Sequence, residues 1–385
     1  MKKIFFLTLA FILGLNLQNL NAQCTDCTTT VNNFTSSSNY TFTAGTKTCF
    51  TGTSTISHDV IFGNNASLCV EPGATLNFGA NSYSVGSTSD LFTIDVWGTL
   101  NISQTREWKG KMFINIHSQG TLYIPNTIKL NGPAITLTND GTFTVGTIEF
   151  NQTGATITIT NNSAMTVTGQ FNISEGNAWF KNTGTLSVAN NYSSNATSVY
   201  INCGTYTGQF NLNKGGKLIN TGTFNTSQID YGGPTSRVEN YGHFNVSGNI
   251  NLGGSGSVFY NEGITTFTAG QFSSDGNLQG PSDASKTGYF IWPSSNKAIM
   301  NSGSIGPNLN FSTNSGNSNE ANMFNNPGSL TWLSGITWGG TQPTTLPATD
   351  CPQPDGTPAV PVPKSTSVCV GFNLTSLQTY YSNVT

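Results

Sequence analysis

Carboxylates are the residues of this chain that could perform acid–base chemistry. Cleavage of a polysaccharide needs two carboxylates, or one carboxylate with an Arg or Lys, on neighbouring turns of one face. The acidic residues are scattered and do not recur at equivalent positions of the repeat described below, as the main ones show: Asp140, Glu149, Glu175, Asp230, Glu239 and Glu262. We therefore expect a protein that is not an enzyme and carries no cofactor. A polysaccharide-degrading enzyme is the alternative.

Metal or redox chemistry would need clustered histidines or cysteines. His58, His117 and His243 stand in unrelated contexts, and His243 replaces a Thr that we expect to face solvent. Cys24 and Cys27 form a C-x-x-C pair, but no His or second C-x-x-C stands at ligand spacing. The sequence therefore predicts no metal site. It predicts that Cys24 and Cys27 take part in structural disulfide bonds.

The cysteines are odd in number, which leaves at least one of them without a partner in the chain. There are seven of them. Candidate disulfide cysteines are Cys24, Cys27, Cys49, Cys69, Cys351 and Cys369. We expect the first four to staple the amino-terminal end and the last two to form a local pair. Cys203 is then left over.

One dense charge cluster, Arg106–Lys111, contains Trp108 among its cations. An exposed Trp beside charged residues could contact a glycan ring or a partner protein. Arg106, Trp108, Lys109 and Lys111 therefore form a candidate contact loop. The alternative is a Trp tucked beneath a solvated loop.

Charge and the first residues restrict the location and the partners. Charged residues make up only 8% of the chain and the net charge is −3. We therefore expect no positively charged surface that would attract nucleic acid. Lys2 and Lys3 precede an apolar run, and small and polar residues end at Ala22, as in a secretory signal cleaved after that residue. We expect a secreted or cell-surface protein with no membrane span in the mature chain.

An uncharged phrase, Asn-x-Gly-Thr followed by an apolar residue, recurs along the chain. The step is close to twenty residues, which is typical of a solenoid. Its asparagines are Asn139, Asn161, Asn182, Asn202, Asn220, Asn240 and Asn261. Looser copies extend the repeat from about residue 70 to about residue 340.

Each repeat contains three short segments in which apolar and polar residues alternate, the pattern of β-strands. We expect an all-β chain, folded as a right-handed parallel β-helix of about 20-residue, three-strand coils. The apolar residue of the phrase would then form one inward column: Leu100, Leu122, Phe143, Met165, Leu186, Tyr206, Phe224 and Phe244. The Asn would form a structural corner ladder, each amide bonding to the next, and the Gly would supply the backbone freedom of the corner.

These coils resemble the right-handed parallel β-helix of filamentous-haemagglutinin-like adhesins and autotransporter passenger domains. The resemblance rests on repeat length, Asn-x-Gly corners and inward alternation over about two thirds of the chain. It implies an adhesin-like surface protein and contributes no active residues. No membrane barrel follows in this sequence.

The ends of the chain differ from the repeat. We expect a signal peptide at 1–22, a disulfide-stapled cap at 23–69, the β-helix at 70–340 and a Pro-rich linker at 341–365. Residues 366–385 resemble the opening strands of immunoglobulin-like modules in bacterial surface proteins of the type IX secretion route. This resemblance implies that the chain is the amino-terminal part of a longer adhesin.

A second alternative comes from the outward threonines of the phrase. Regular Thr columns on a flat β-helix face can present hydroxyl and methyl groups to ice. The columns are interrupted, for example at Ala164 and His243, and Thr simply favours exposed strand positions. The function we expect is therefore a structural and adhesive β-solenoid that contacts an extracellular glycan or protein surface.

Overall fold

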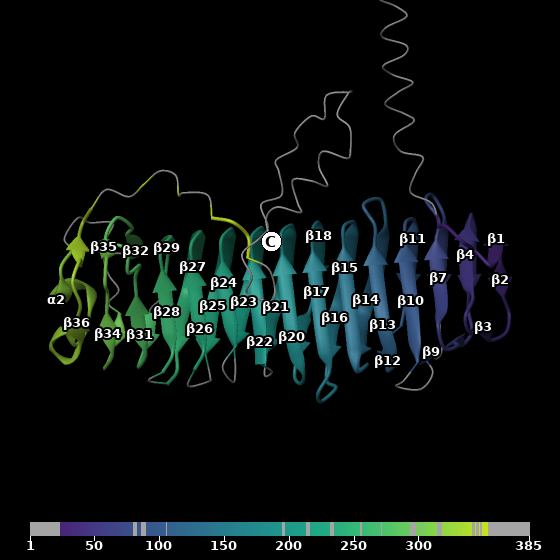
Figure 1. Ribbon diagram of the computed structural model, residues 1–385, viewed down its shortest axis with the longest axis horizontal. Helices are drawn as coiled ribbons and strands as arrows, with labels where there is room; N and C mark the ends of the chain where they lie inside the picture. The colour runs from purple at the N-terminus through teal and green to yellow at the C-terminus, as the bar shows by residue number, and fades with distance from the viewer. Residues whose placement is uncertain are drawn as a thin grey trace, which may run out of the picture.

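The chain folds into a long stack of parallel β-coils with almost no helix (Figure 1). The computed structural model describes residues 24–352. It leaves out 80–82, 86–89, 105, 195–196, 213–215, 232–234, 255, 271, 293–297, 301, 314–317, 341–342, 344–345 and 347–348. The predicted signal peptide and immunoglobulin-like segment, 1–22 and 366–385, lie outside the described residues. The prediction of an all-β parallel solenoid is confirmed.

The first face of the solenoid is a fifteen-stranded parallel sheet, called sheet A here. Its strands, in spatial order, are β1 (Thr29–Asn32), β4 (Lys47–Thr51), β7 (Ala66–Val70), β10 (Leu91–Val96), β13 (Lys111–Ile116), β15 (Ala134–Asn139), β17 (Thr156–Asn161), β20 (Asn177–Asn182), β22 (Thr197–Asn202), β24 (Lys217–Asn220), β26 (Arg237–Asn240), β28 (Val258–Asn261), β31 (Asn277–Gln279), β34 (Ser304–Ile305) and β36 (Thr331–Trp332).

The remaining strands form the other faces. Sheet B contains β2 (Thr35–Ser36), β5 (Thr53–Ile56), β8 (Thr75–Phe78), β11 (Thr99–Ile102), β12 (Arg106–Trp108), β14 (Thr121–Leu130), β16 (Thr142–Phe150), β18 (Ala164–Val167), β19 (Gln170–Ile173), β21 (Thr185–Ser194), β23 (Thr205–Leu212), β25 (Thr223–Tyr231), β27 (His243–Leu252), β29 (Ile264–Phe267), β30 (Phe272–Ser274), β32 (Gly288–Trp292), β33 (Ile299–Met300), β35 (Leu309–Thr313) and β37 (Thr337–Trp338). Sheet C contains β3 (Tyr40–Phe42), β6 (Val60–Phe62) and β9 (Tyr83–Val85).

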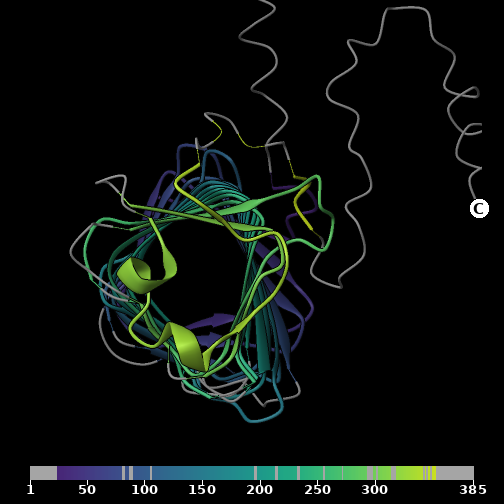
Figure 2. The ribbon, with the colours of Figure 1, turned by 90° about the vertical axis from the view of Figure 1, so that its left-hand side faces the viewer.

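Sheet B bends, so that a coil has three faces in cross-section (Figure 2). The first half of β16 pairs with β18 and its second half pairs with β19. In β21, β23 and β25 the register shifts between the two halves, which is the bulge that turns the strand from one face to the next. The prediction of three strands per coil therefore holds, with two of them often fused.

The core is a set of like-on-like columns along the axis. The predicted inward column is confirmed, because Leu186 pairs with Tyr206, and Phe224 follows in the next coil. The rings of Tyr206 and Phe224 are 4.3 Å apart, and those of Phe224 and Phe244 are 4.8 Å apart. These spacings match the distance between hydrogen-bonded strands, so each ring covers the ring before it.

The glycines of the repeated phrase have a different role from the one predicted. None of the six adopts a positive φ, so backbone freedom is not the reason for them. A Cβ at any of these positions would overlap a carbonyl oxygen of the preceding coil, as at Gly222 against the oxygen of Gly204. Close stacking of the corners is what requires Gly here. The six are Gly141, Gly184, Gly204, Gly222, Gly242 and Gly263.

The solenoid begins about forty residues earlier than the sequence predicted. Strand β1 pairs with β4, and β4 pairs with β7, so the segment assigned to a cap at 23–69 already forms coils. Phe42 and Phe62 stack at 4.5 Å in this part of the core. The coils escaped prediction because their corners lack the Asn-x-Gly phrase.

The carboxyl-terminal end of the core is closed by short helical segments. These are α2 (Glu320–Met323) and η1 (Pro327–Ser329). Phe324, directly after α2, is buried and contacts Trp332 edge-on at 5.2 Å. Neither helix of the described chain approaches the length and apolar character needed to cross a membrane.

Candidate functional site

The ladder asparagines lie one above another inside the corner. Each is fully buried, and each except Asn261 donates a hydrogen bond from Nδ2 to Oδ1 of the Asn in the next coil. The six distances, from Asn139 to Asn261, are 2.7, 2.6, 2.7, 2.8, 2.8 and 2.8 Å. The amides also donate to corner carbonyls, as Asn182 does to Thr205 at 3.1 Å. The role of these residues is therefore structural.

The ladder has a direction, and its two ends differ. Every Nδ2 donates toward the later coil. The first acceptor of the ladder, Oδ1 of Asn139, therefore has no asparagine in the preceding coil to donate to it. Among the described residues, nothing donates to Oδ1 of Asn139, although that atom is buried. At the other end, Asn261 donates to the carbonyl of Tyr289 at 2.9 Å. One end is unsatisfied and the other is closed by the backbone.

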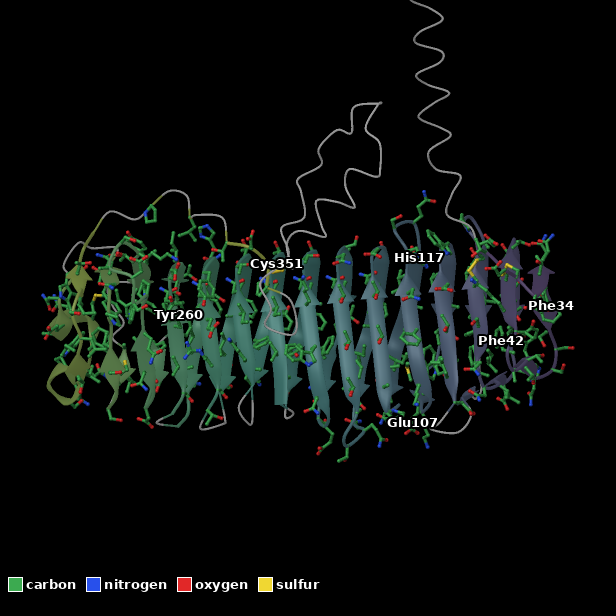
Figure 3. All side chains as sticks on the ribbon, in the orientation of Figure 1. Phe34, Phe42, Glu107, His117, Tyr260 and Cys351 are labelled. Carbon is green, nitrogen blue, oxygen red and sulfur yellow. A yellow bond between two sulfur atoms is a disulfide. The ribbon has the colours of Figure 1, made fainter. Side chains whose placement is uncertain are left out.

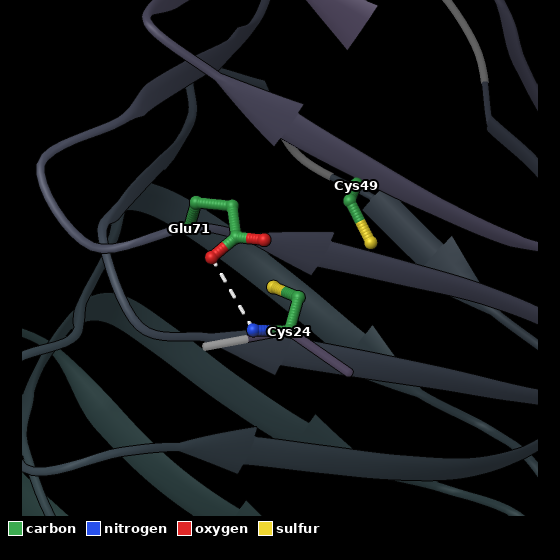
Figure 4. Close-up of side chains that lie close together, drawn as sticks. All are labelled: Cys24, Cys49 and Glu71. Atoms are coloured by element: carbon green, nitrogen blue, oxygen red, sulfur yellow. Dashed lines mark hydrogen bonds between the residues drawn. The ribbon is translucent and has the colours of Figure 1, made fainter. Parts of the chain in front are cut away.

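The four amino-terminal cysteines form two disulfides, Cys24–Cys69 and Cys27–Cys49. The predicted staple is thus observed. Cys24, Cys49 and Glu71 bring two sulfurs and a carboxylate within 4.8 Å of one another (Figure 4). Both sulfurs are in disulfides and cannot act as thiolate ligands, and Glu71 accepts a hydrogen bond from the Cys24 amide at 3.2 Å. This cluster fits a staple and does not fit a metal centre.

The third disulfide corrects the predicted pairing. Cys351 bonds to Cys203, which the sequence left unpaired, rather than to Cys369, which lies outside the described residues. The two partners are 148 residues apart. They meet because the chain after β37 runs back along the solenoid, as its yellow end shows in Figure 1. We call the described residues of this segment, Pro343, Leu346 and 349–352, the strap.

Cys203 belongs to a column on the outer side of the corner. Its members are the residues that follow the ladder asparagines: Asp140, Asn162, Thr183, Cys203, Thr221, Tyr241 and Glu262. We call it the corner column. The strap returns over the last part of this column and is fixed to it at Cys203.

Between the strap and the coils lies a cleft of about 590 Å³, here called the corner cleft. This volume is within the range of small-molecule sites. Its lining on the coils is Tyr241, Glu262 and Tyr289, on the connection before β32 Ser285, Lys286 and Thr287, and on the strap Pro343, Leu346, Thr349 and Asp350. Figure 3 labels the nearby Tyr260 and, at the anchored end of the strap, Cys351.

Glu262 is the central charged group of the corner cleft. Its Oε1 pairs with Nζ of Lys286 at 2.6 Å, and its Oε2 accepts the hydroxyl of Tyr260 at 2.7 Å. Lys286 comes from the long connection between β31 and β32, and half of its side chain remains exposed. The ring of Tyr241 lies 5.5 Å from that of Tyr260.

A second carboxylate, Glu239, lies beside the cleft in the preceding coil. It pairs with Lys217 at 2.9 Å and with Arg237 at 2.6 Å. It also accepts the hydroxyl of Tyr241 at 3.4 Å, and Arg237 lies over the ring of Tyr260 at 5.9 Å. Two carboxylates, three cations and two tyrosines thus form one connected cluster in a chain that has few charges.

Proton affinities in the cluster follow from these contacts. Burial would raise the pKa of Glu239, but the hydrogen bonds and charges of Arg237 and Lys217 outweigh it and lower that pKa. Burial raises the pKa of Tyr241 and of Tyr260, and the neighbouring carboxylates raise both further. The hydrogen bond to Glu262 raises the pKa of Lys286. At neutral pH Glu239 is therefore ionised, Lys286 is a cation, and the phenols of Tyr241 and Tyr260 are neutral.

This arrangement is suited to binding polar, ring-shaped molecules. Aromatic faces can pack against a sugar ring, while the ammonium and carboxylate can hydrogen-bond to its hydroxyls. A general acid for glycoside cleavage must be protonated near neutral pH, which needs a raised pKa. The lowered pKa of Glu239 is opposite to that requirement.

The candidate contact loop is divided by the structure. Trp108 is fully buried and packs edge-on against Phe92 at 5.8 Å, so the tucked alternative holds for this residue. The side chain of Arg106 lies outside the described part, although its backbone is in β12. Lys109 and Lys111 are exposed, and Lys109 pairs with Glu107 at 3.5 Å. Without the Trp, the loop is an ordinary charged surface.

The threonines align as the sequence predicted and extend further toward the amino terminus. Register places in one outward column Thr53, Thr75, Thr99, Thr121, Thr142, Ala164, Thr185, Thr205, Thr223 and His243. The second column holds Thr144, Thr166, Ser187 and Thr207, between the exposed Tyr123 and the half-buried Asn225. His243 is exposed as expected. Of the four coils that carry the second column, only three have Thr or Ser in both columns, because Ala164 interrupts the first.

The other histidines do not join a shared site. His58 is exposed, whereas His117 stacks on Trp97 at 3.5 Å and lies 3.5 Å from Asp95. Asp95 also pairs with Lys47 at 3.6 Å. This small cluster lies on sheet A beside the amino-terminal disulfides.

Sequence reasoning missed the corner cleft. Glu239 and Glu262 are not in register, because Glu239 pairs with Tyr260, and so they do not form the paired carboxylates that polysaccharide cleavage needs. The available signal was the corner column itself, in which Cys203, Tyr241 and Glu262 replace small polar residues.

Comparison of the chain with protein-family models, curated proteins and solved structures finds no match. Its description therefore rests on its own fold, a parallel β-solenoid stapled by disulfides.

Proposed function

We propose that this chain is a secreted or cell-surface structural and adhesive module that catalyses no reaction. The observation that carries the proposal is the corner cleft, where tyrosines and paired charges gather on rigid coils beside a disulfide-anchored strap. Recognition surfaces are rich in Tyr because its ring offers a large contact area and a hydrogen-bonding tip. The rest of the solenoid holds this surface in place.

The architecture suits a spacer that carries load outside the cell. Parallel coils bond to both neighbours throughout their length, and the amide ladder ties seven successive corners. Disulfides fix the amino-terminal coils and the strap, and such bonds persist in oxidising surroundings. These features support export and display at a surface.

The state of the carboxylates supports a binding role over a catalytic one. Both oxygens of Glu262 already have partners, and Glu239 is held ionised by two cations. Polysaccharide cleavage uses a general acid with a raised pKa, and the lowered pKa of Glu239 does not favour that role.

Attachment of protein-coated beads to cells and to immobilised polysaccharides tests the proposal. We expect beads coated with the wild-type protein to attach, and beads coated with the Tyr241→Ala, Tyr289→Ala variant to attach several-fold less. Attachment equal to that of uncoated beads would contradict adhesion. Release of reducing or unsaturated ends from the polysaccharides, or thermal hysteresis in ice, would favour the enzyme or the ice-binding alternative.

A further inference from the structure

We infer that the corner cleft is a binding site for a short, uncharged oligosaccharide lying along the solenoid axis. This inference rests on the proposed adhesive function and specifies the ligand class for it.

The cleft follows the axis because its residues come from successive coils. Tyr241 and Glu262 are consecutive members of the corner column, and Tyr289 in β32 pairs with Ile264 in the coil of Glu262. Adjacent coils are about 4.8 Å apart, so these three positions span roughly 10 Å. The strap covers one side of this path, with Pro343 and Leu346 as apolar wall. An extended chain of linked rings fits this shape better than a compact molecule.

The charges of the lining select against ionic ligands. Glu262 and Asp350 place two carboxylates in the cleft against the single ammonium of Lys286. An acidic sugar would therefore meet repulsion, and a cationic ligand would have to compete with Lys286 for Glu262. A neutral sugar avoids both costs.

Donors and acceptors for sugar hydroxyls remain available. Lys286 carries three N–H donors, and its contact with Glu262 uses one of them. Each carboxylate oxygen of Glu262 accepts one bond from its protein partner and retains a second lone pair. Lys286 and Glu262 thus form a donor–acceptor pair in the same lining as Tyr241 and Tyr289.

Titration calorimetry and saturation-transfer NMR with the full chain test this inference. The probes are neutral hexasaccharides of glucose, xylose and mannose, and oligogalacturonate of the same length as the acidic counterpart. We expect at least one neutral hexasaccharide to bind at least tenfold more tightly than oligogalacturonate. Failure of every neutral probe to bind at millimolar concentration, or tighter binding of the acidic probe, would overturn the inference.

Substitutions then locate the binding. Tyr241→Ala should weaken binding at least tenfold, while Tyr123→Ala, which removes an exposed tyrosine of sheet B away from the cleft, should leave affinity unchanged. Lys286→Gln alters an exposed side chain and should weaken binding several-fold without affecting the fold. Equal affinity for wild type, Tyr241→Ala and Lys286→Gln would place the saccharide elsewhere and refute the inference.

The outcomes separate this inference from the function it rests on. If beads attach to cells but no neutral saccharide binds the cleft, adhesion stands and the ligand class is wrong. If a neutral saccharide binds the cleft but coated beads do not attach, the site stands and adhesion is wrong.

Discussion

The same inward corner position is filled in two different ways along the solenoid. In the amino-terminal coils it is apolar, with Val31, Phe50, Val70, Val96 and Ile116 in register. From Asn139 onward it holds the amide ladder, and Ile116 pairs directly with Asn139 at the junction. The first region is stapled outside its core by two disulfides, whereas the ladder region has none between its own corners among the described residues.

The difference shows what each solution demands. An apolar corner needs only burial and has no direction, so any aliphatic or aromatic residue of suitable size serves. An amide corner needs a donor on one side and an acceptor on the other, so its stability depends on the neighbouring coils. The ladder corners are therefore joined to one another by the coils alone, whereas the amino-terminal coils are joined by strand pairing and by two disulfides.

The largest effect should come from removing a staple. We expect the Cys24→Ser, Cys69→Ser variant to lose about 4 kcal/mol of stability, because the bond closes a 45-residue loop of the unfolded chain. Hydrogen exchange should show the loss in β1, β4 and β7, with little change in the ladder strands, since coils contact only their neighbours. Equal loss of protection in both regions would show that they unfold as one unit.

Cutting the ladder in its middle should cost less than the staple but more than cutting it at its end. Asn202→Leu deprives Asn220 Oδ1 of its donor and Asn182 Nδ2 of one acceptor. We expect a loss of about 2–3 kcal/mol by urea unfolding.

The matched control is Asn139→Leu, where Oδ1 is already unsatisfied. That substitution leaves Asn161 Oδ1 unpaired in its place, so the number of orphan side-chain acceptors is unchanged, and the Ala164 carbonyl loses the Asn139 donor. We expect a change below about 1 kcal/mol. Equal costs for the two variants would mean that the direction of the ladder has no energetic weight.

Buried tyrosines within the ladder region sharpen the comparison further. In the described structure no partner reaches the buried hydroxyl of Tyr192, whereas Tyr206 donates to the Gln209 carbonyl at 2.6 Å. Tyr192→Phe should therefore raise the free energy of unfolding by about 1 kcal/mol, and Tyr206→Phe should lower it by about the same. Thermal unfolding of the two variants measures the difference. Destabilisation of similar size in both would show that the Tyr192 hydroxyl is satisfied in solution.

The smallest effect concerns pH. Amides do not titrate, but the pKa of Glu239 is lowered in the folded state by Arg237 and Lys217. The contribution of Glu239 to the stability of the fold is therefore present above its unfolded pKa, about 4.3. It is lost as the pH falls through the pKa of Glu239 in the folded state. We expect Glu239→Gln to cost below about 1 kcal/mol at pH 7 and nothing near pH 2. A cost that is independent of pH would assign the effect to packing rather than charge.

The sequence predicted the ladder coils because polar residues at a buried position must repeat to be satisfied. The amino-terminal coils were missed for the converse reason, since Val31 or Phe50 at that position leaves no recurring phrase. The Cys203–Cys351 bond could not be derived from spacing, because it depends on where the strap returns. The sequence left Trp108 either exposed in the charged loop or tucked beneath it. Its full burial shows that the second position is the one it occupies.

The corner cleft was unpredictable for a similar reason. Its residues come from three coils, a long connection and the strap, and only the coil register brings Tyr241, Glu262 and Lys286 together. Sequence patterning finds what repeats, whereas this site is built from the exceptions to the repeat.

The one-way order of the ladder bears on how such a rod can change its length. If a duplicated coil were placed between Asn182 and Asn202, its own ladder asparagine would accept a hydrogen bond from Asn182 and donate one to Asn202. The count of orphan groups would stay the same, so tandem duplication inside the row carries no polar penalty. A longer rod could therefore evolve by copying single coils, without redesign of either end.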